Sequence, residues 1–206
     1  MKWILVGLGN PGSDYDMTRH NAGRMLAEYV AKKNSADEFR DTKKANAHIT
    51  SASVKENEVT IVLPDTFMNK SGLAVMKFVK SAKAAERLIV CYDDLDLPLG
   101  ALKVSFDRGS GGHKGVESVI RSVKTKKFIR VRIGVSPASA KGVAKKPSGE
   151  KAVLDFILKT FKPHERAILD TVFTRAADAI ETIISDGRER AMNTSNRPTQ
   201  KVPSVL

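Results

Sequence analysis

One histidine and a run of acids have the residue types of a hydrolytic pair. His20 lies in a polar loop, and Asp93-Asp94-Leu95-Asp96 follows an apolar run that is typical of a buried strand. Neighbouring parallel strands end at the same edge of a sheet, so the loop and the acids can meet there. An imidazole oriented by a carboxylate can activate water as a general base. The same acids could instead hold Mg²⁺, and a lone histidine is more often a cap or a surface residue.

Two asparagines and a glycine-rich loop add neutral hydrogen-bonding groups at other predicted loops. Asn10 and Asn69 offer side-chain amides that can donate to a developing oxyanion or bind a peptide backbone, although both positions also suit ordinary turns. The segment 109–115, with the sequence GSGGHKG, opens a predicted helix. Exposed backbone amides in such a segment suit a phosphate, and a flexible lid is the alternative.

The segment 7–12, with the sequence GLGNPG, has the spacing of the dinucleotide-binding fingerprint, which raises the possibility of an oxidoreductase. Its context does not fit. In dinucleotide-binding folds the turn feeds directly into a helix, whereas residues 13–20 intervene here before a helical pattern begins. The acids that follow, Asp37 and Glu38, lie in a polar stretch and not at a strand end. The sequence therefore disfavours a dinucleotide site.

Hydrophobic periodicity predicts the elements that must position these groups. Near-continuous apolar runs, typical of strands buried on both faces of a sheet, occur at 3–8, 59–63 and 88–92. Further strands are expected at 46–54, where the strand pairs with 59–63, at 101–107 and at 128–136. Helical spacing occurs at 22–30, 75–82, 116–123 and from Pro163 to Asp186.

This alternation of strand and helix predicts an α/β fold: a single-domain sandwich with a mixed, mainly parallel twisted sheet and helices on both faces. The domain is expected to span residues 1–193, and residues 194–206, which lack periodicity, are expected to form a disordered tail. Ligands of such sheets bind outside the carboxyl ends of the strands. The polar segments 9–21, 64–72 and 93–100 are expected at that edge.

The positive charge of the chain is concentrated in one block. The 206 residues carry a net charge of +12, and residues 101–151 contain thirteen Lys or Arg against three acids. The remaining residues contain 22 basic side chains against 20 acids, so they are nearly neutral. A one-sided block of this kind is typical of a polyanionic partner, because neutralised phosphates release counterions. A solvated basic surface is the alternative.

The sequence predicts a soluble, cytoplasmic protein. No apolar run approaches the length of a membrane helix. The apolar start of the chain ends at Asn10-Pro11-Gly12 without the small-residue cleavage site of a signal peptide. The single cysteine, Cys91, lies in an apolar run and is expected to be a buried free thiol in a reducing compartment.

Taken in order, a set of short motifs resembles the bacterial peptidyl-tRNA hydrolase family. The resemblance spans about residues 3–193, and it depends on the order and spacing of the motifs and not on any single one. The motifs are GLGNPG at 7–12, Tyr15, TRHNAG at 18–23, Pro64, TFMN at 66–69, Ser71-Gly72, DDLD at 93–96, GGH at 111–113 and RVRIG at 130–134.

The resemblance implies hydrolysis of the ester bond between a peptide and the terminal ribose of tRNA, by attack of water and without a metal or other cofactor. It implies that His20 is the catalytic base and that Asp93 orients it. Asn10 and Asn69 would hold the peptide and assist at the ester carbonyl. The implied substrate-binding positions are Tyr15, Asn21, Phe67, Met68, Asn69, His113 and Lys114. In the basic block, Lys103 and Arg132 match positions that clamp the 5′-phosphate of tRNA.

The implied partner is peptidyl-tRNA, bound through its acceptor stem and 3′ end. No membrane and no obligate protein partner are expected, so the chain is predicted to be a monomer. A non-catalytic RNA-binding protein on the same fold is the alternative function. The presence of His20, Asp93, Asn10 and Asn69 favours the enzyme.

Two positions depart from the family pattern. Lys114 stands where the family usually has asparagine, and a lysine cannot accept a hydrogen bond. Because Lys114 belongs to the basic block, the sequence favours its recruitment to a phosphate over a contact with the peptide or its water. Ser105 stands where a second basic residue of the phosphate clamp is common.

Overall fold

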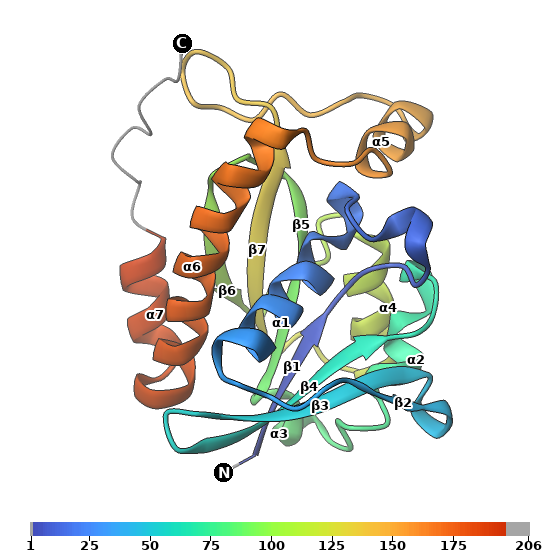
Figure 1. Cartoon of the computed structure of the whole chain (residues 1–206), viewed down its shortest axis with the longest axis vertical. Helices are drawn as coiled ribbons and strands as arrows, with labels where there is room; N and C mark the ends of the chain where they lie inside the picture. Colours follow the sequence, from blue (N-terminus) through green and yellow to red (C-terminus); the bar gives the residue numbers. More distant parts are fainter. Residues whose placement is uncertain (1, 197–206) are drawn as a thin grey trace.

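The computed structural model describes residues 2–196, which form one seven-stranded sheet between two layers of helices (Figure 1). The strand order is β2-β3-β4-β1-β5-β7-β6. The four central strands are parallel: β4 (Asn57–Pro64), β1 (Lys2–Gly7), β5 (Leu88–Pro98) and β7 (Ile129–Ser136). The outer strands pair antiparallel: β2 (Arg40–Thr42), β3 (Ala47–Val54) and β6 (Leu102–Phe106). The predicted α/β fold is confirmed.

The helices cover both faces of the sheet and bury one apolar cluster on each (Figure 1). One layer contains α1 (Ala22–Lys33), α6 (Pro163–Asp186) and α7 (Arg188–Ser195). The other contains α2 (Ser71–Val75), α3 (Ala82–Ala85) and α4 (Lys114–Val123). The short helix α5 (Glu150–Ile157) lies apart from both layers, at the carboxyl end of the central strands. Among the described residues, no helix combines the length and the apolar composition needed to cross a bilayer.

Strand β5 shows why the central strands have continuous apolar sequences. Ile89 and Cys91 belong to the cluster under α1 and α6, whereas Val90 and Tyr92 belong to the cluster on the opposite face. Because side chains alternate along a strand, both faces of β5 are buried. The buried thiol predicted for Cys91 is confirmed. The same alternation directs the next two side chains, Asp93 and Asp94, to opposite faces of the sheet.

Helix α1 packs directly against the backbone of β1 and β5, and glycines make this possible. A Cβ atom at Gly23 would lie 2.1 Å from the carbonyl oxygen of Cys91, and one at Gly7 would lie 2.6 Å from the Cβ of Ala27. Gly7 of the GLGNPG segment therefore serves helix packing. Two 3-10 turns, η1 (Ser13–Tyr15) and η2 (Arg19–Asn21), separate β1 from α1, so the chain does not form a dinucleotide-binding turn.

The helix predicted across residues 75–82 is wrong. Helix α2 ends at Val75, and α3 begins separately at Ala82 after Ser81, whose side chain accepts a hydrogen bond of 3.1 Å from the N–H of Ala84. Val75 and Val79 are nevertheless buried in the same cluster, so the apolar spacing is real although the helix is interrupted. Strand β2 and helices α5 and α7 were not predicted.

The carboxyl-terminal helix α7 returns to the edge of the sheet. It includes Thr194 and Ser195, so the prediction of a disordered tail is wrong for its first residues, and residues 197–206 lie outside the described part. The side-chain amide of Asn196 pairs with the backbone of Val104 in β6. Its Oδ1 accepts from the N–H at 2.7 Å, and its Nδ2 donates to the carbonyl oxygen at 2.9 Å.

Candidate active site

His20 and Asp93 meet at the carboxyl end of the sheet, as the sequence predicts. His20 belongs to η2, just before α1, and Asp93 lies in β5, the strand beside β1. The Nδ1 atom of His20 lies 3.0 Å and 3.1 Å from the two carboxylate oxygens of Asp93. Both residues are buried, with His20 8% and Asp93 3% exposed. The carboxylate therefore fixes the orientation of the imidazole inside the fold.

A second imidazole holds the same carboxylate. The Nε2 atom of His113 lies 2.9 Å from Oδ1 of Asp93, and its Nδ1 accepts a hydrogen bond of 3.2 Å from the backbone N–H of Val116. Because Nδ1 is an acceptor here, the proton of a neutral His113 belongs on Nε2, where it is donated to Asp93. His113 thus holds the carboxylate of Asp93 from the side opposite His20, a contact that the sequence did not indicate.

The two imidazoles control the charge of Asp93. Burial acts to raise the pKa of this carboxyl, but the neighbouring His20 and His113 outweigh burial and hold the pKa below its usual range. Asp93 is therefore ionised at neutral pH and accepts hydrogen bonds from both rings. His20 then donates through Nδ1, which leaves its Nε2 atom free to accept a proton. This tautomer is the one that a general base requires.

Asn10 is held in place by its neighbours. The side chain of Asn21 is fully buried and bonds the backbone of Asn10 twice, to the N–H at 2.8 Å and to the carbonyl oxygen at 3.0 Å. Oδ1 of Asn10 accepts a hydrogen bond of 2.8 Å from the N–H of Met68, so its Nδ2 remains the donor of the amide. Asn21 and the buried Met68 therefore position Asn10, and the predicted contacts of Asn21 and Met68 with substrate stay predictions.

Three further predicted positions lie around this centre. Tyr15 is half-buried in η1. Asn69 is exposed in η4 (Met68–Lys70), and Phe67, just before this turn, has 59% of its surface accessible. These side chains do not line the cavity described next. Their contacts with substrate stay predictions.

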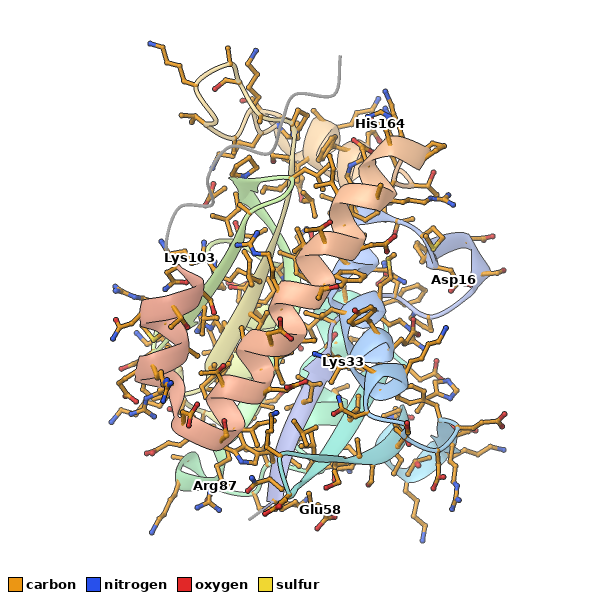
Figure 2. The ribbon with its side chains drawn as sticks, turned by 60° about the vertical axis from the view of Figure 1, so that its left-hand side comes forward. Asp16, Lys33, Glu58, Arg87, Lys103 and His164 are labelled. Carbon is orange, nitrogen blue, oxygen red and sulfur yellow. The ribbon has the colours of Figure 1, made fainter. Side chains whose placement is uncertain are left out.

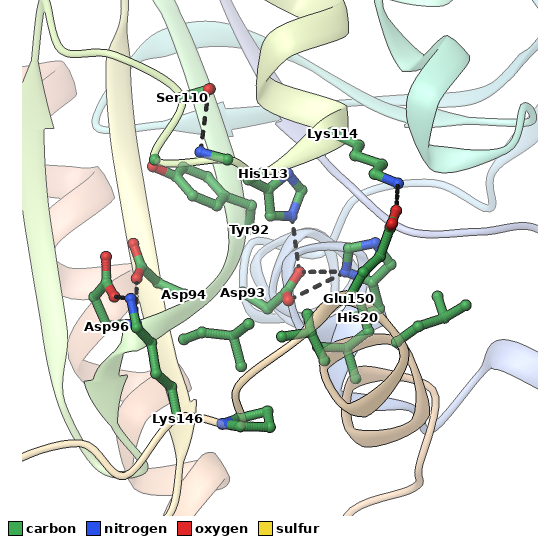
Figure 3. A pocket seen from close by; sticks show the side chains of 17 residues that line it. His20, Tyr92, Asp93, Asp94, Asp96, Ser110, His113, Lys114, Lys146 and Glu150 are labelled. Atoms are coloured by element: carbon green, nitrogen blue, oxygen red, sulfur yellow. Dashed lines mark hydrogen bonds and ion pairs between the residues drawn. The ribbon is translucent and has the colours of Figure 1, made fainter.

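A cavity of about 350 Å³ opens beside the two histidines (Figure 3). His20, Asp93 and His113 line one side of it. Helix α5 lines it with apolar side chains, those of Val153, Leu154 and Ile157. The volume lies within the range of ligand-binding pockets. An apolar wall that faces the polar pair of His20 and Asp93 suits a ligand with an uncharged group next to a polar one.

Two ion pairs span the rim of this cavity (Figure 3). Lys114 Nζ lies 3.1 Å from Glu150 Oε1, which connects the first residues of α4 and α5. Lys146 Nζ lies 2.6 Å from Asp96 Oδ1, which connects the segment before α5 to β5. All four side chains are exposed, so these pairs depend on ionic strength.

The described residues contain one group of side chains close enough to share a metal ion, namely His20, Asp93 and His113, with ligand atoms within 4.8 Å of one another. Hydrogen bonds of 2.9 Å to 3.1 Å account for these contacts. The Mg²⁺ alternative for the acidic run is not supported, because each of its carboxylates already has a side-chain partner, and the partners of Asp93 are the two histidines. Asp94 pairs with Arg132 and Asp96 with Lys146.

Comparison with known proteins gives the family. The sequence profile of peptidyl-tRNA hydrolase matches residues 4–203. The chain belongs to the peptidyl-tRNA hydrolase family. A peptidyl-tRNA hydrolase from Thermodesulfovibrio yellowstonii is 39% identical over 197 residues, which cover 94% of this chain and 98% of the relative. One from Sulfurihydrogenibium sp. is 38% identical over 195 residues, which cover 94% and 96%.

Solved structures agree with this family. The crystal structure of peptidyl-tRNA hydrolase from Acinetobacter baumannii matches with a TM-score of 0.84 and 28% identity, over 95% of this chain and 94% of that one. A peptidyl-tRNA hydrolase in complex with N-propanol gives the same values. Hydrolysis of peptidyl-tRNA is the function of the peptidyl-tRNA hydrolase family, and it is the function that the sequence predicts.

The two basic positions of the predicted phosphate clamp lie side by side. Lys103 of β6 and Arg132 of β7 are directly paired in the antiparallel ladder, and Lys103 is exposed near the end of α7 (Figure 2). Arg132 is partly buried, and its Nε donates to Asp94 Oδ2 at 2.6 Å. Ser105 is buried and paired with the buried Arg130, so this departure from the family pattern places no charge at the surface.

The structure gives Lys114 a partner that the sequence did not suggest. Its ammonium group pairs with Glu150 of α5, at the rim of the cavity. The sequence missed α5 because the preceding residues 137–149 are rich in Lys, Ser, Gly and Pro and show no periodicity. The spacing of Val153, Leu154 and Ile157 after Gly149 was the one available signal of a short amphipathic helix.

Proposed function

We propose that this chain hydrolyses the ester bond between a peptide and the 3′-terminal ribose of tRNA, with His20 as the general base. The observation that carries the proposal is the hydrogen bond from Nδ1 of His20 to the buried carboxylate of Asp93, beside the cavity of about 350 Å³. A base held in this way needs no nucleophilic side chain, because water is the nucleophile.

The reaction would proceed as follows. Nε2 of His20 takes a proton as the water oxygen bonds to the ester carbonyl carbon. Asp93 stays ionised and stabilises the imidazolium that forms. The imidazolium then returns the proton to the ribose oxygen as the bond between that oxygen and the carbonyl carbon breaks. The products are a tRNA with a free terminal hydroxyl and a peptide with a free carboxyl group, which releases its proton to solvent at neutral pH.

Asn10 is suited to stabilise the charge that develops on the carbonyl oxygen. Its Oδ1 accepts from Met68, so the amide is fixed with Nδ2 as donor. A preorganised donor of this kind costs no reorientation in the transition state. We assign binding of the peptide backbone to Asn69, Tyr15 and Phe67. We assign binding of the side chain of the esterified residue to the cavity, which Lys114 and His113 line.

The tRNA would extend over the basic face of β6 and β7, with Lys103 and Arg132 at its 5′-phosphate. We further propose that the reaction uses no metal or other cofactor and that the chain acts as a cytoplasmic monomer, because one chain supplies every group named above. A non-catalytic RNA-binding role is disfavoured, since such a role would not require the buried arrangement of His20, Asp93 and His113.

Hydrolysis of N-acetylated aminoacyl-tRNA by the purified protein tests the proposal. The variant His20→Ala should lose about 10² to 10⁴ in rate while tRNA affinity stays close to that of the wild type, because a general base acts in the transition state. His48→Ala, which changes a half-buried histidine of β3, is the matched control and should keep full activity. A His20→Ala protein with more than about a tenth of wild-type activity would falsify the assignment of the base.

A further inference from the structure

Arg19 is the residue before His20 and is one of the few buried cations in the described structure, with 5% of its surface exposed. Two glutamate oxygens and two backbone carbonyls surround its guanidinium group. Nη2 donates to both carboxylate oxygens of Glu165, at 2.9 Å and 2.7 Å, and Nη1 donates to the carbonyl oxygens of Lys159 and Thr160, at 3.0 Å and 2.8 Å. Such a planar fork cannot be reproduced by a lysine.

The partners of Arg19 all lie where α5 joins α6. Lys159 and Thr160 come just after Leu158, the C-cap of α5, and Glu165 is in the first turn of α6. The guanidinium carbon also lies 4.7 Å from the ring centre of Phe156 in α5 and 5.2 Å from that of Phe161. Arg19 therefore holds the carboxyl-terminal end of α5 through charge, hydrogen bonds and aromatic contacts.

The backbone reinforces this attachment on both sides of Arg19. The N–H of Arg19 donates to the carbonyl oxygen of Lys159 at 3.1 Å, and the N–H of Phe161 donates to that of Met17 at 3.1 Å. The turn that carries His20 and the junction that carries α5 are thus joined as one unit. Because α5 supplies one wall of the cavity, the base and that wall are fixed relative to each other.

From this geometry we propose that Arg19 is a positioning residue for the hydrolysis reaction. It sets the distance between the His20 imidazole and the apolar wall formed by Val153, Leu154 and Ile157, and so places the ester carbonyl against the base. The inference rests on the proposed function. Arg19 touches no reacting atom; it acts through His20 and α5.

The test uses Arg19→Lys and Glu165→Gln, with Lys33→Met as the matched control. Lys33 joins α1 to α6 through ion pairs with Asp178 and Glu181, at 2.7 Å and 2.9 Å, but at the far end of these helices from the site (Figure 2). For N-acetylated aminoacyl-tRNA, Arg19→Lys and Glu165→Gln should lower kcat by about 10- to 100-fold, because small misplacements of reacting groups are costly. KM should change by less than about threefold, since the tRNA contacts remain. Lys33→Met should lower Tm and leave kcat unchanged.

The ¹⁵N and ¹H resonances of the His20 imidazole, assigned with His20→Asn, give a second readout that does not require activity. They should move in Arg19→Lys and in Glu165→Gln, and stay in place in Lys33→Met. The proposal is overturned if Arg19→Lys and Glu165→Gln lower Tm as the control does while kcat and the His20 resonances stay as in the wild type. Should Arg19→Lys not fold, Glu165→Gln, which preserves side-chain shape, decides alone. A wild-type protein without hydrolase activity would refute the proposed function, and the resonances would then decide on Arg19.

Discussion

At the scale of single residues, the centre of the site is one carboxylate with two imidazole donors. Asp93 fixes the tautomer of His20 on one side and is itself fixed by His113 on the other. The sequence could indicate the first contact, because both residues follow neighbouring predicted strands. It could not indicate the second, because the path of the glycine-rich loop before His113 depends on tertiary contacts such as the hydrogen bond of Arg130 with Gly109.

Asp93→Asn should change the dependence of stability on pH. The pKa of Asp93 is lowered in the fold, so its ionised form stabilises the fold above the unfolded pKa of about 3.9. This contribution is lost as the pH falls through the lower folded pKa. The free energies of unfolding of the wild type and Asp93→Asn should therefore differ most from about pH 5 upward and converge as the pH falls to about 2 and below. Denaturant titrations across this range check the prediction, and a difference that persists undiminished in acid would contradict it.

At the scale of elements, the close packing of α1 on the sheet positions His20. Gly23→Ala would place a Cβ atom 2.1 Å from the carbonyl oxygen of Cys91, so α1 would have to move away from β5. We expect the free energy of unfolding to fall by about 1 to 3 kcal/mol and the hydrolase activity to decrease. Gly109→Ala is the control, since a Cβ atom there meets nothing within 4 Å. Thermal unfolding of both variants measures the effect, and equal losses would show that the contact with Cys91 is not the cause.

The pair Lys114 and Glu150 connects α4 to α5 across the mouth of the cavity. Lys114→Glu should raise KM, because two carboxylates then repel each other at the rim and α5 is displaced. Exchange of the two charges in Lys114→Glu/Glu150→Lys should restore much of the loss, and high salt should reduce both effects. Steady-state kinetics at two salt concentrations provide the measurement. Lys151→Glu, an exposed neighbouring position of α5, is the control for net charge. If the exchanged variant is no better than Lys114→Glu, the lysine serves the substrate directly.

Elements that fill the core were easier to predict than elements that serve the site. Ile180 and Ile184 in α6 have a helical spacing because they pack on the sheet, and the predicted limits of this helix, Pro163 and Asp186, are those observed. Helix α5 covers a cavity, is only 8 residues long and buries one residue, Ile157, so its apolar spacing spans too few turns to stand out in the sequence. For residues 75–82 the prediction failed for the opposite reason. Val75 and Val79 are both buried, so their apolar spacing is helical although the helix is interrupted between them.

At the scale of the whole molecule, the basic surface is shaped by the acids beside it. Lys103→Ala should raise KM for 5′-phosphorylated tRNA and lower the salt dependence of binding by about one ion. Arg132→Ala should raise KM more, because it also leaves the carboxylate of Asp94 without its partner beside the bound phosphate. Asp94→Asn should strengthen tRNA binding. Measuring tRNA binding at several salt concentrations tests whether Arg132→Ala weakens binding more than Lys103→Ala does. Normal binding by both alanine variants would rule out the phosphate clamp.

The contact between Asn196 and Val104 has a consequence for self-association. The outward N–H and C=O groups of an edge strand can pair with the edge of another sheet, which is a common start of aggregation. In β6 the central residue, Val104, has both of these groups occupied by one side-chain amide. Asn196, the residue that caps helix α7, thereby protects the exposed edge of the sheet, so loss of its amide should favour association of the protein through β6.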